Sequence, residues 1–68
     1  MKLSARNILA GKIIEVKKGA TTAHVRIAVG DAVITSSITN EAVDELGLKA
    51  GMSASAVIKS SDVMIAVD

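Results

Sequence analysis

Two short clusters near the ends of the chain combine a cation with hydroxyl groups. Near the start the sequence reads Ser4-Ala5-Arg6-Asn7, and near the end it reads Lys59-Ser60-Ser61. Arginine offers a planar fork of N–H donors, lysine a compact ammonium and serine an adjustable O–H, so both clusters suit a small tetrahedral oxyanion. Each cluster taken singly also has a plainer explanation, in which Ser4 begins a turn and Lys59 is a solvated strand end.

Two further stretches could supply hydrogen-bond donors. The turn Lys17-Lys18-Gly19-Ala20-Thr21 could present successive backbone N–H groups as an anion-binding nest, with positive charge nearby. A solvated hairpin turn is the more frequent explanation of such a segment. Residues 35–39 place several hydroxyls in a strand, Ser36 and Ser37 among them, and cross-strand pairing of hydroxyl side chains explains them equally well.

Catalytic groups are not recognisable in the sequence. Cysteine is absent, and the single histidine, His24, stands mid-strand among polar neighbours, where a solvated or interface role is expected. The seven carboxylates are scattered, so they predict neither a general acid/base pair nor a carboxylate metal cage. No glycine is followed by the Lys-Ser/Thr pair of a phosphate loop. We therefore expect a binding protein and not an enzyme.

Five strands and one short helix are predicted to position the donor groups. Alternation and β-branched residues predict strands over residues 9–16, 20–29, 32–39, 53–59 and 64–67. Residues 40–47 change period, and a Thr or Asn cap, early acids and a closing Gly47 predict a helix of two turns. The fold class is therefore all-β, and the order suits a five-stranded Greek-key barrel of the oligonucleotide/oligosaccharide-binding (OB) type.

Length and composition predict self-association. The 68 residues hold one domain, residues 1–68, and a core of this size is marginally stable alone. Disulfides are excluded, and one histidine without cysteine makes a Cys/His zinc site untenable. Half of the residues are hydrophobic and none is aromatic, and apolar residues stand side by side in strands, as Ile13 and Ile14 do. One face should fill the barrel and the other should meet a neighbouring subunit.

Membrane and nucleic-acid roles are disfavoured by the sequence. No run approaches the roughly 20 apolar residues of a membrane helix, and Met1-Lys2-Leu3 leads into polar residues instead of a signal-peptide core. A cytoplasmic location is expected. A net charge of +1 and the lack of aromatic residues oppose binding to single-stranded nucleic acid, which remains an alternative for an OB-type barrel that salt-dependent binding would revive.

The order and spacing of several short motifs resemble the molbindins, a family that binds molybdate and tungstate. The resemblance runs essentially end to end. It rests on Ser4-Ala5-Arg6-Asn7, residues 11–19, Ile34-Thr35-Ser36-Ser37-Ile38, Glu45-Leu46-Gly47-Leu48 and residues 57–65. The same module resembles the C-terminal domains of molybdate-transporter ATPases and the repeated domains of molybdate-responsive regulators.

The resemblance implies a homo-hexamer, a trimer of dimers, that holds molybdate or tungstate at subunit interfaces as a cytoplasmic store, without an organic cofactor. An oxyanion-sensing module that acts with a separate partner protein is the alternative. Ser4, Arg6 and the main chain near Ala5 would meet Lys59 and Ser60, with the two groups drawn from one subunit or two. A second set would comprise Gly19, Ala20, Ser36 and Ser37, with Ser61 as a further candidate. His24 and Arg26 match no motif of the family.

Overall fold

The computed structural model describes residues 2–68, so Met1, the first residue of the N-terminal segment discussed above, lies outside the described residues. The strands are β1 (Asn7–Lys18), β2 (Thr22–Val29), β3 (Ala32–Thr39) and β4 (Ser53–Ile58). The helix α1 (Asn40–Leu46) follows β3, and the 3-10 turn η1 (Ser60–Asp62) follows β4. Over residues 2–68, no helix has the length and hydrophobicity needed to cross a bilayer.

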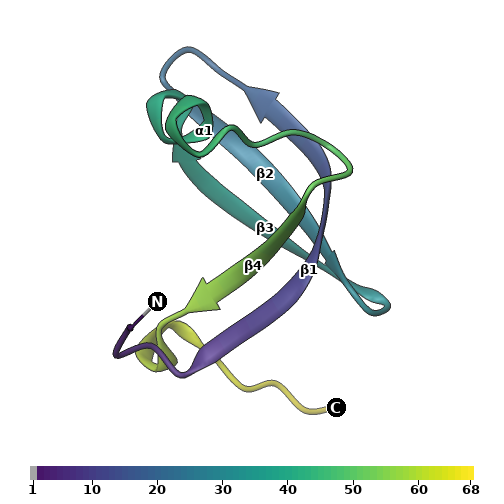
Figure 1. Cartoon of the computed structure of the whole chain (residues 1–68). Coiled ribbons are helices and arrows are strands. Elements are labelled where there is room, and N and C mark those ends of the chain that lie inside the picture. The colour runs from purple at the N-terminus through teal and green to yellow at the C-terminus, as the bar shows by residue number, and fades with distance from the viewer. Residues whose placement is uncertain (1) are drawn as a thin grey trace.

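The four strands form one antiparallel sheet in the order β3-β2-β1-β4 (Figure 1). β1 pairs with β2 along one side, where Val16 lies opposite Val25. It pairs with β4 along the other side, where Asn7 lies opposite Ile58. The long strand β1 therefore joins the two halves of the sheet.

The first four predicted strands are found in the structure with small differences in their bounds. β1 extends two residues beyond the prediction at each end, β2 begins two residues later than predicted and β4 ends one residue earlier. The predicted alternation in β2 is also confirmed. Ala23, Val25 and Ile27 are buried, while the intervening residues Thr22, His24 and Arg26 are exposed. One face of the sheet is thus apolar and the other is polar in this region.

An irregularity in β1 separates its two adjacent isoleucines. The register with β2 shifts between Ile13 and Glu15, which leaves Ile14 as an extra residue in the manner of a β-bulge. Ile13 is only 1% exposed, whereas Ile14 is 47% exposed. The sequence expectation that apolar residues occupy both faces is confirmed at this position.

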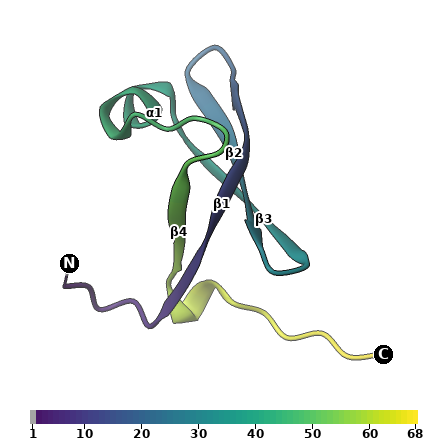
Figure 2. The same cartoon turned by 45° about the vertical axis from the view of Figure 1, so that its right-hand side comes forward.

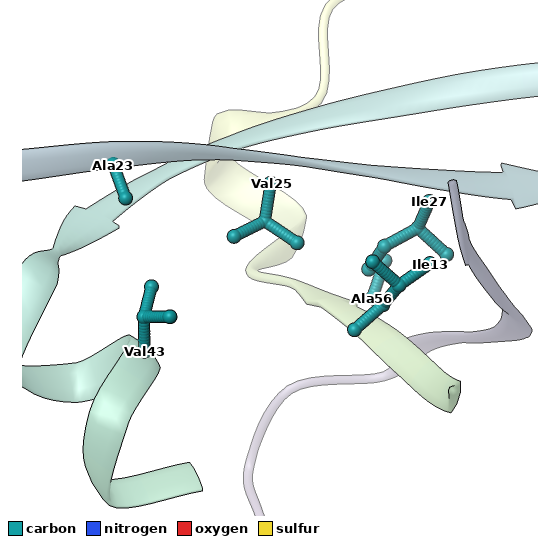
Figure 3. Close-up of a cluster of buried hydrophobic side chains, with 6 residues drawn as sticks. All are labelled: Ile13, Ala23, Val25, Ile27, Val43 and Ala56. Atoms are coloured by element: carbon teal, nitrogen blue, oxygen red, sulfur yellow. The ribbon is translucent and has the colours of Figure 1, made fainter. Parts of the chain in front are cut away.

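A small apolar core lies between the sheet and α1. Figure 3 shows Val43 of α1 pointing toward Ala23 and Val25, with Ile27, Ile13 and Ala56 gathered beside them. The helix is the predicted one. Thr39 caps it by accepting a hydrogen bond from the Ala42 N–H at 3.0 Å, and Gly47 ends it in the left-handed conformation at φ +63°.

The five-stranded closed barrel expected from the sequence is not found among residues 2–68. The sheet has four strands and is not closed, and residues 63–68 form no strand. Met64, Ile65 and Val67 are 91%, 86% and 91% exposed. The chain leaves the sheet at η1 and runs away from it in both views (Figures 1 and 2). These residues have strand-forming side chains, but they lie against no sheet edge of their own chain, and β pairing requires one.

Candidate anion-binding site

The pairing of β1 with β4 brings the two terminal clusters together. Asn7 is the first residue of β1 and lies opposite Ile58, the last residue of β4. The side-chain amide of Asn7 donates to the Ile58 carbonyl at 3.2 Å. Arg6 directly precedes this pair and Lys59 directly follows it. We call Ser4, Ala5, Arg6, Lys59 and Ser60 the terminal cluster.

The turn η1 fixes the local path of the backbone on the lysine side of this cluster. The Asp62 N–H donates to the Lys59 carbonyl at 2.9 Å, and the Val63 N–H donates to the Ser60 carbonyl at 3.2 Å. Ser60 and Ser61 therefore stand at the start of a tight turn, where the backbone N–H groups have no hydrogen-bond partner within the turn. Lys59, Ser60 and Ser61 together offer an ammonium and two hydroxyls in three consecutive residues.

The terminal cluster is open to solvent in one chain. Ser4, Arg6, Lys59, Ser60 and Ser61 are exposed, and Ala5 is partly buried. Charged donors in water gain little from an anion, because water screens the attraction and competes for the hydrogen bonds. The chain alone therefore supplies the donors but not the water-excluding walls that a tight anion site needs.

A second group of donors surrounds the β1–β2 turn. A hollow of about 260 Å³ is lined by Lys17, Lys18, Gly19, Thr22 and His24, and we call it the hairpin hollow. A hydrogen bond closes the turn at this hollow: the Gly19 N–H donates to the Thr22 carbonyl at 2.7 Å. The site is preorganised, but it is shallow and flanked by exposed side chains.

Contacts with α1 hold the hairpin in place. The side-chain amide of Asn40 donates to the Gly19 carbonyl at 2.9 Å, and the Asn40 N–H donates to the Thr21 carbonyl at 2.9 Å. Lys18 forms an ion pair with Asp44 of α1, with Nζ and Oδ1 2.5 Å apart. Since Lys18 is paired, Lys17 is the lysine of this hollow better placed to meet an anion.

The strand register separates the two serines that the sequence grouped together. Ser37 lies opposite His24, and His24 lies opposite Lys17, so these three residues form one row on the polar face of the sheet. Ser36 points to the other face, where it is partly buried and lines a different hollow with Ile34. Ser37 therefore shares the face of His24 and Ser36 does not, and neither serine lines the hairpin hollow. Ala20 is exposed and is not among the lining residues.

The terminal cluster and the hairpin hollow lie at opposite ends of β1, one at Asn7 and the other at Lys18. They are therefore separate candidate sites within one chain. Sequence reasoning missed Thr22 and His24 as residues of the hairpin hollow. The alternation of Thr22, His24 and Arg26 was visible, and counting back from the β1–β2 turn would have placed His24 opposite Lys17.

Comparison with known proteins identifies the family. The TOBE domain model matches residues 3–65, and molybdenum-pterin-binding protein 3 of Clostridium pasteurianum is 54% identical over 67 residues, covering 96% of this chain and 97% of the relative. The chain belongs to the TOBE-domain, Mop-like family. The resemblance to the molbindins is thereby confirmed.

Solved structures of this Mop-like family have the same fold. A molybdate-binding protein from Sporomusa ovata matches with a TM-score of 0.93 at 27% identity, over 98% of this chain and all of that one. The cytoplasmic molybdate-binding protein ModG, with molybdate bound, matches with a TM-score of 0.88 at 54% identity, over 94% of this chain and 46% of ModG. The fold of this chain is therefore that of Mop-like molybdate-binding proteins.

Proposed function

We propose that this chain binds molybdate or tungstate and serves as an intracellular store or buffer of the anion. The observation that carries the proposal is the Asn7–Ile58 pair, which brings Arg6 and Lys59 to the same end of the sheet. Relatives named for molybdate or molybdenum-pterin binding support it, since two of them are 54% identical to this chain over the matched residues. We assign the anion to Ser4, Arg6, Lys59, Ser60 and the main chain near Ala5, with Ser61 at the margin.

The chemistry of the terminal cluster suits a tetrahedral dianion. Molybdate and tungstate are fully deprotonated near neutral pH, so all of their oxygens accept hydrogen bonds from guanidinium, ammonium and hydroxyl donors. Phosphate is partly protonated there and would present an O–H to groups that are themselves donors. Sulfate has the right charge but is smaller, and each donor that it fails to reach costs roughly 1–3 kcal/mol.

We place the binding site at a seam between subunits, in a homo-hexamer arranged as a trimer of dimers. The exposure of the terminal cluster supports this placement, because a second chain would exclude the water that a single chain admits. The core is small, and large apolar side chains such as Ile8, Ile14 and Val57 are 42–47% exposed, which favours association. Residues 1–68 then act as a single domain whose five-stranded barrel is completed in the assembly. An anion bound only by the assembly stabilises it by mass action.

A second anion site is assigned to the hairpin hollow. Gly19, Ala20 and Ser37 remain its candidate residues from the sequence, and the lining adds Lys17 and His24. We assign no anion contact to Ser36 in this site, because it points to the opposite face of the sheet. The preorganised turn and the neighbouring ammonium group support this assignment.

The proposed role is binding, without catalysis and without an organic cofactor, in the cytoplasm. Relatives named as binding proteins support this role, and ModG is described as cytoplasmic. The sensing module is disfavoured, because a relative that matches over almost its whole length is named as a binding protein and not as a regulator.

Isothermal titration calorimetry tests the proposed function. Molybdate, tungstate and sulfate are titrated separately into protein from which bound anion has been removed by dialysis. We expect saturable heat with molybdate and tungstate and much weaker heat with sulfate. The absence of saturable heat with both larger anions would refute the proposal.

A further inference from the structure

Asn40, the first residue of α1, holds two carbonyl groups of the turn between β1 and β2. Its side-chain Nδ2 donates to the Gly19 carbonyl at 2.9 Å, and its backbone N–H donates to the Thr21 carbonyl at 2.9 Å. A third carbonyl of the turn, that of Thr22, accepts from the Gly19 N–H at 2.7 Å. Three of the four carbonyls in residues 19–22 are therefore engaged within the protein.

The two polar atoms of the Asn40 side chain are not used equally. Its Oδ1 is buried and has no hydrogen-bond partner among residues 2–68, and an unpaired buried acceptor is destabilising. Its Nδ2 makes the bond to Gly19. The polar contribution of this side chain is therefore its action on the turn.

The bond from Asn40 fixes the direction of the Ala20 N–H. The Gly19 carbonyl and the Ala20 N–H belong to one peptide unit, which is planar and, like the other peptide bonds of the described residues, trans. In such a unit the C=O and the N–H point in opposite directions. Because the carbonyl points to Asn40, the Ala20 N–H points away from it. This N–H has no hydrogen-bond partner within residues 2–68.

This arrangement favours an anion at the turn. A carbonyl oxygen carries partial negative charge and repels an anion, whereas an unengaged backbone N–H attracts one. The carbonyls of Gly19 and Thr21 are turned toward Asn40, which leaves the Ala20 N–H as a donor. Lys17 adds a positive charge to the hairpin hollow, which Gly19 and Thr22 also line.

We propose that Asn40 is the positioning residue of the second anion site, where it aims the Ala20 N–H at an oxygen of a tetrahedral oxyanion. Asn40 acts through the turn and does not itself touch the anion. The inference rests on the proposed function, because it takes the hairpin hollow to be an anion site. It goes further in assigning the affinity of that site to one side-chain amide of α1.

Nuclear magnetic resonance on the intact, isotope-labelled protein tests this role. The amide signal of Ala20 is followed as sodium molybdate is added, and the amides of Arg6 and Lys59 report the terminal cluster in the same spectra. In Asn40→Ala, we expect the molybdate concentration that half-saturates the Ala20 shift to rise roughly threefold to tenfold. The concentration that half-saturates the Arg6 and Lys59 shifts should stay at the wild-type value.

Thr39→Ala is the matched control. It removes the hydroxyl that accepts from the Ala42 N–H, so it weakens the cap of α1 and leaves the bond to the Gly19 carbonyl in place. Positioning predicts wild-type half-saturation of the Ala20 shift in Thr39→Ala. Without anion, the carbonyl carbon signal of Gly19 should shift in Asn40→Ala and not in Thr39→Ala, since only the first variant loses the bond to that carbonyl.

The outcomes separate this role from the proposed function. Wild-type half-saturation of the Ala20 shift in Asn40→Ala, or equal weakening in Asn40→Ala and Thr39→Ala, would overturn the positioning role. If the Arg6 and Lys59 amides respond to molybdate in the wild type while the Ala20 amide does not, the second site and its positioning residue are wrong and the terminal cluster stands. If none of the three amides responds, the proposed function fails as well.

Discussion

The two ends of β1 hold donor groups in different ways. At the Lys18 end, the chain completes its own support: Asn40 donates to the Gly19 carbonyl and Lys18 pairs with Asp44. At the Asn7 end, the described side-chain support is the bond from Asn7 to Ile58. The donors beyond that bond are exposed.

This difference indicates how each end can bind an anion. The hairpin end is supported within one chain, and one of its two lysines is already paired with Asp44, so we expect any anion that binds there to be held weakly. The terminal end has two cations, Arg6 and Lys59, that are exposed to water, and in the proposed assembly a second chain would exclude that water. Affinity at the terminal end should therefore depend on assembly, while affinity at the hairpin end should not.

Removing either cation of the terminal cluster should have the largest effect. Arg6→Ala and Lys59→Ala each remove hydrogen bonds to a charged ligand, which contribute about 1.5–3 kcal/mol, so the molybdate Kd should rise about tenfold to a hundredfold. Lys49→Ala, an exposed cation in the turn after α1, is the matched control and should bind normally. Calorimetry measures the affinities, and circular dichroism should show an unchanged sheet. Wild-type affinity in both cluster variants would remove these residues from the site.

A substitution midway along β1 should destabilise the strand that connects the terminal cluster to the hairpin hollow. A Cβ at Gly11 would lie 2.2 Å from the Ala28 carbonyl oxygen and 2.9 Å from the Ile27 side chain. Gly11→Ala should therefore lower the free energy of unfolding by about 1–3 kcal/mol, as measured by urea denaturation. Ala10→Ser, at the exposed neighbouring position, should change it by less than about 0.5 kcal/mol. Equal stability of the two variants would mean that β1 and β2 are not in close contact there.

A matched pair of asparagine variants compares the two ends directly. Asn40→Ala removes the bond to Gly19 and Asn7→Ala removes the bond to Ile58, each worth about 0.5–1.5 kcal/mol. We expect Asn7→Ala to weaken molybdate binding several-fold, because that bond aligns Arg6 with Lys59, and Asn40→Ala to leave binding at the terminal cluster unchanged. Calorimetry and urea denaturation together separate affinity from stability. The opposite pattern would assign the stronger site to the hairpin.

The smallest effect is expected at the ion pair between hairpin and helix. Lys18 and Asp44 have side chains that are 47% and 66% exposed, and exposed pairs contribute about 0–1 kcal/mol. Lys18→Ala should lower the free energy of unfolding by less than about 1 kcal/mol, and the difference from wild type should shrink in high salt. A loss of several kcal/mol, or one insensitive to salt, would show that Lys18 has a role beyond this pair.

The sequence predicts the local features of this protein well. Alternation in Thr22–Val29 and the cap and glycine around α1 are set by neighbouring residues, so they can be recognised without the fold. The proximity of Arg6 and Lys59 depends on the pairing of β1 with β4. The residues alone do not specify this pairing, and only the family resemblance implied it. The separation of Ser36 from Ser37 follows from strand register, and the bulge at Ile14 shows how one extra residue changes which side chains face the core.

The fifth strand shows the limit of prediction from a single sequence. Residues 64–67 have the composition of a strand, but composition does not specify the edge with which a strand pairs. In the structure they form no strand and their large apolar side chains are exposed. Strand pairing is therefore the step at which local pattern and observed structure differ.

The central claim is that Arg6 and Lys59 hold the anion together at a subunit seam. Crystals grown with molybdate and measured at the molybdenum absorption edge locate the metal atom by its anomalous signal. We predict a peak within hydrogen-bonding reach, through the oxygens, of Arg6 and Lys59, with Ser4 and Ser60 around it and two chains enclosing it. Molybdenum found only elsewhere, with the terminal cluster empty at saturating molybdate, would contradict the account.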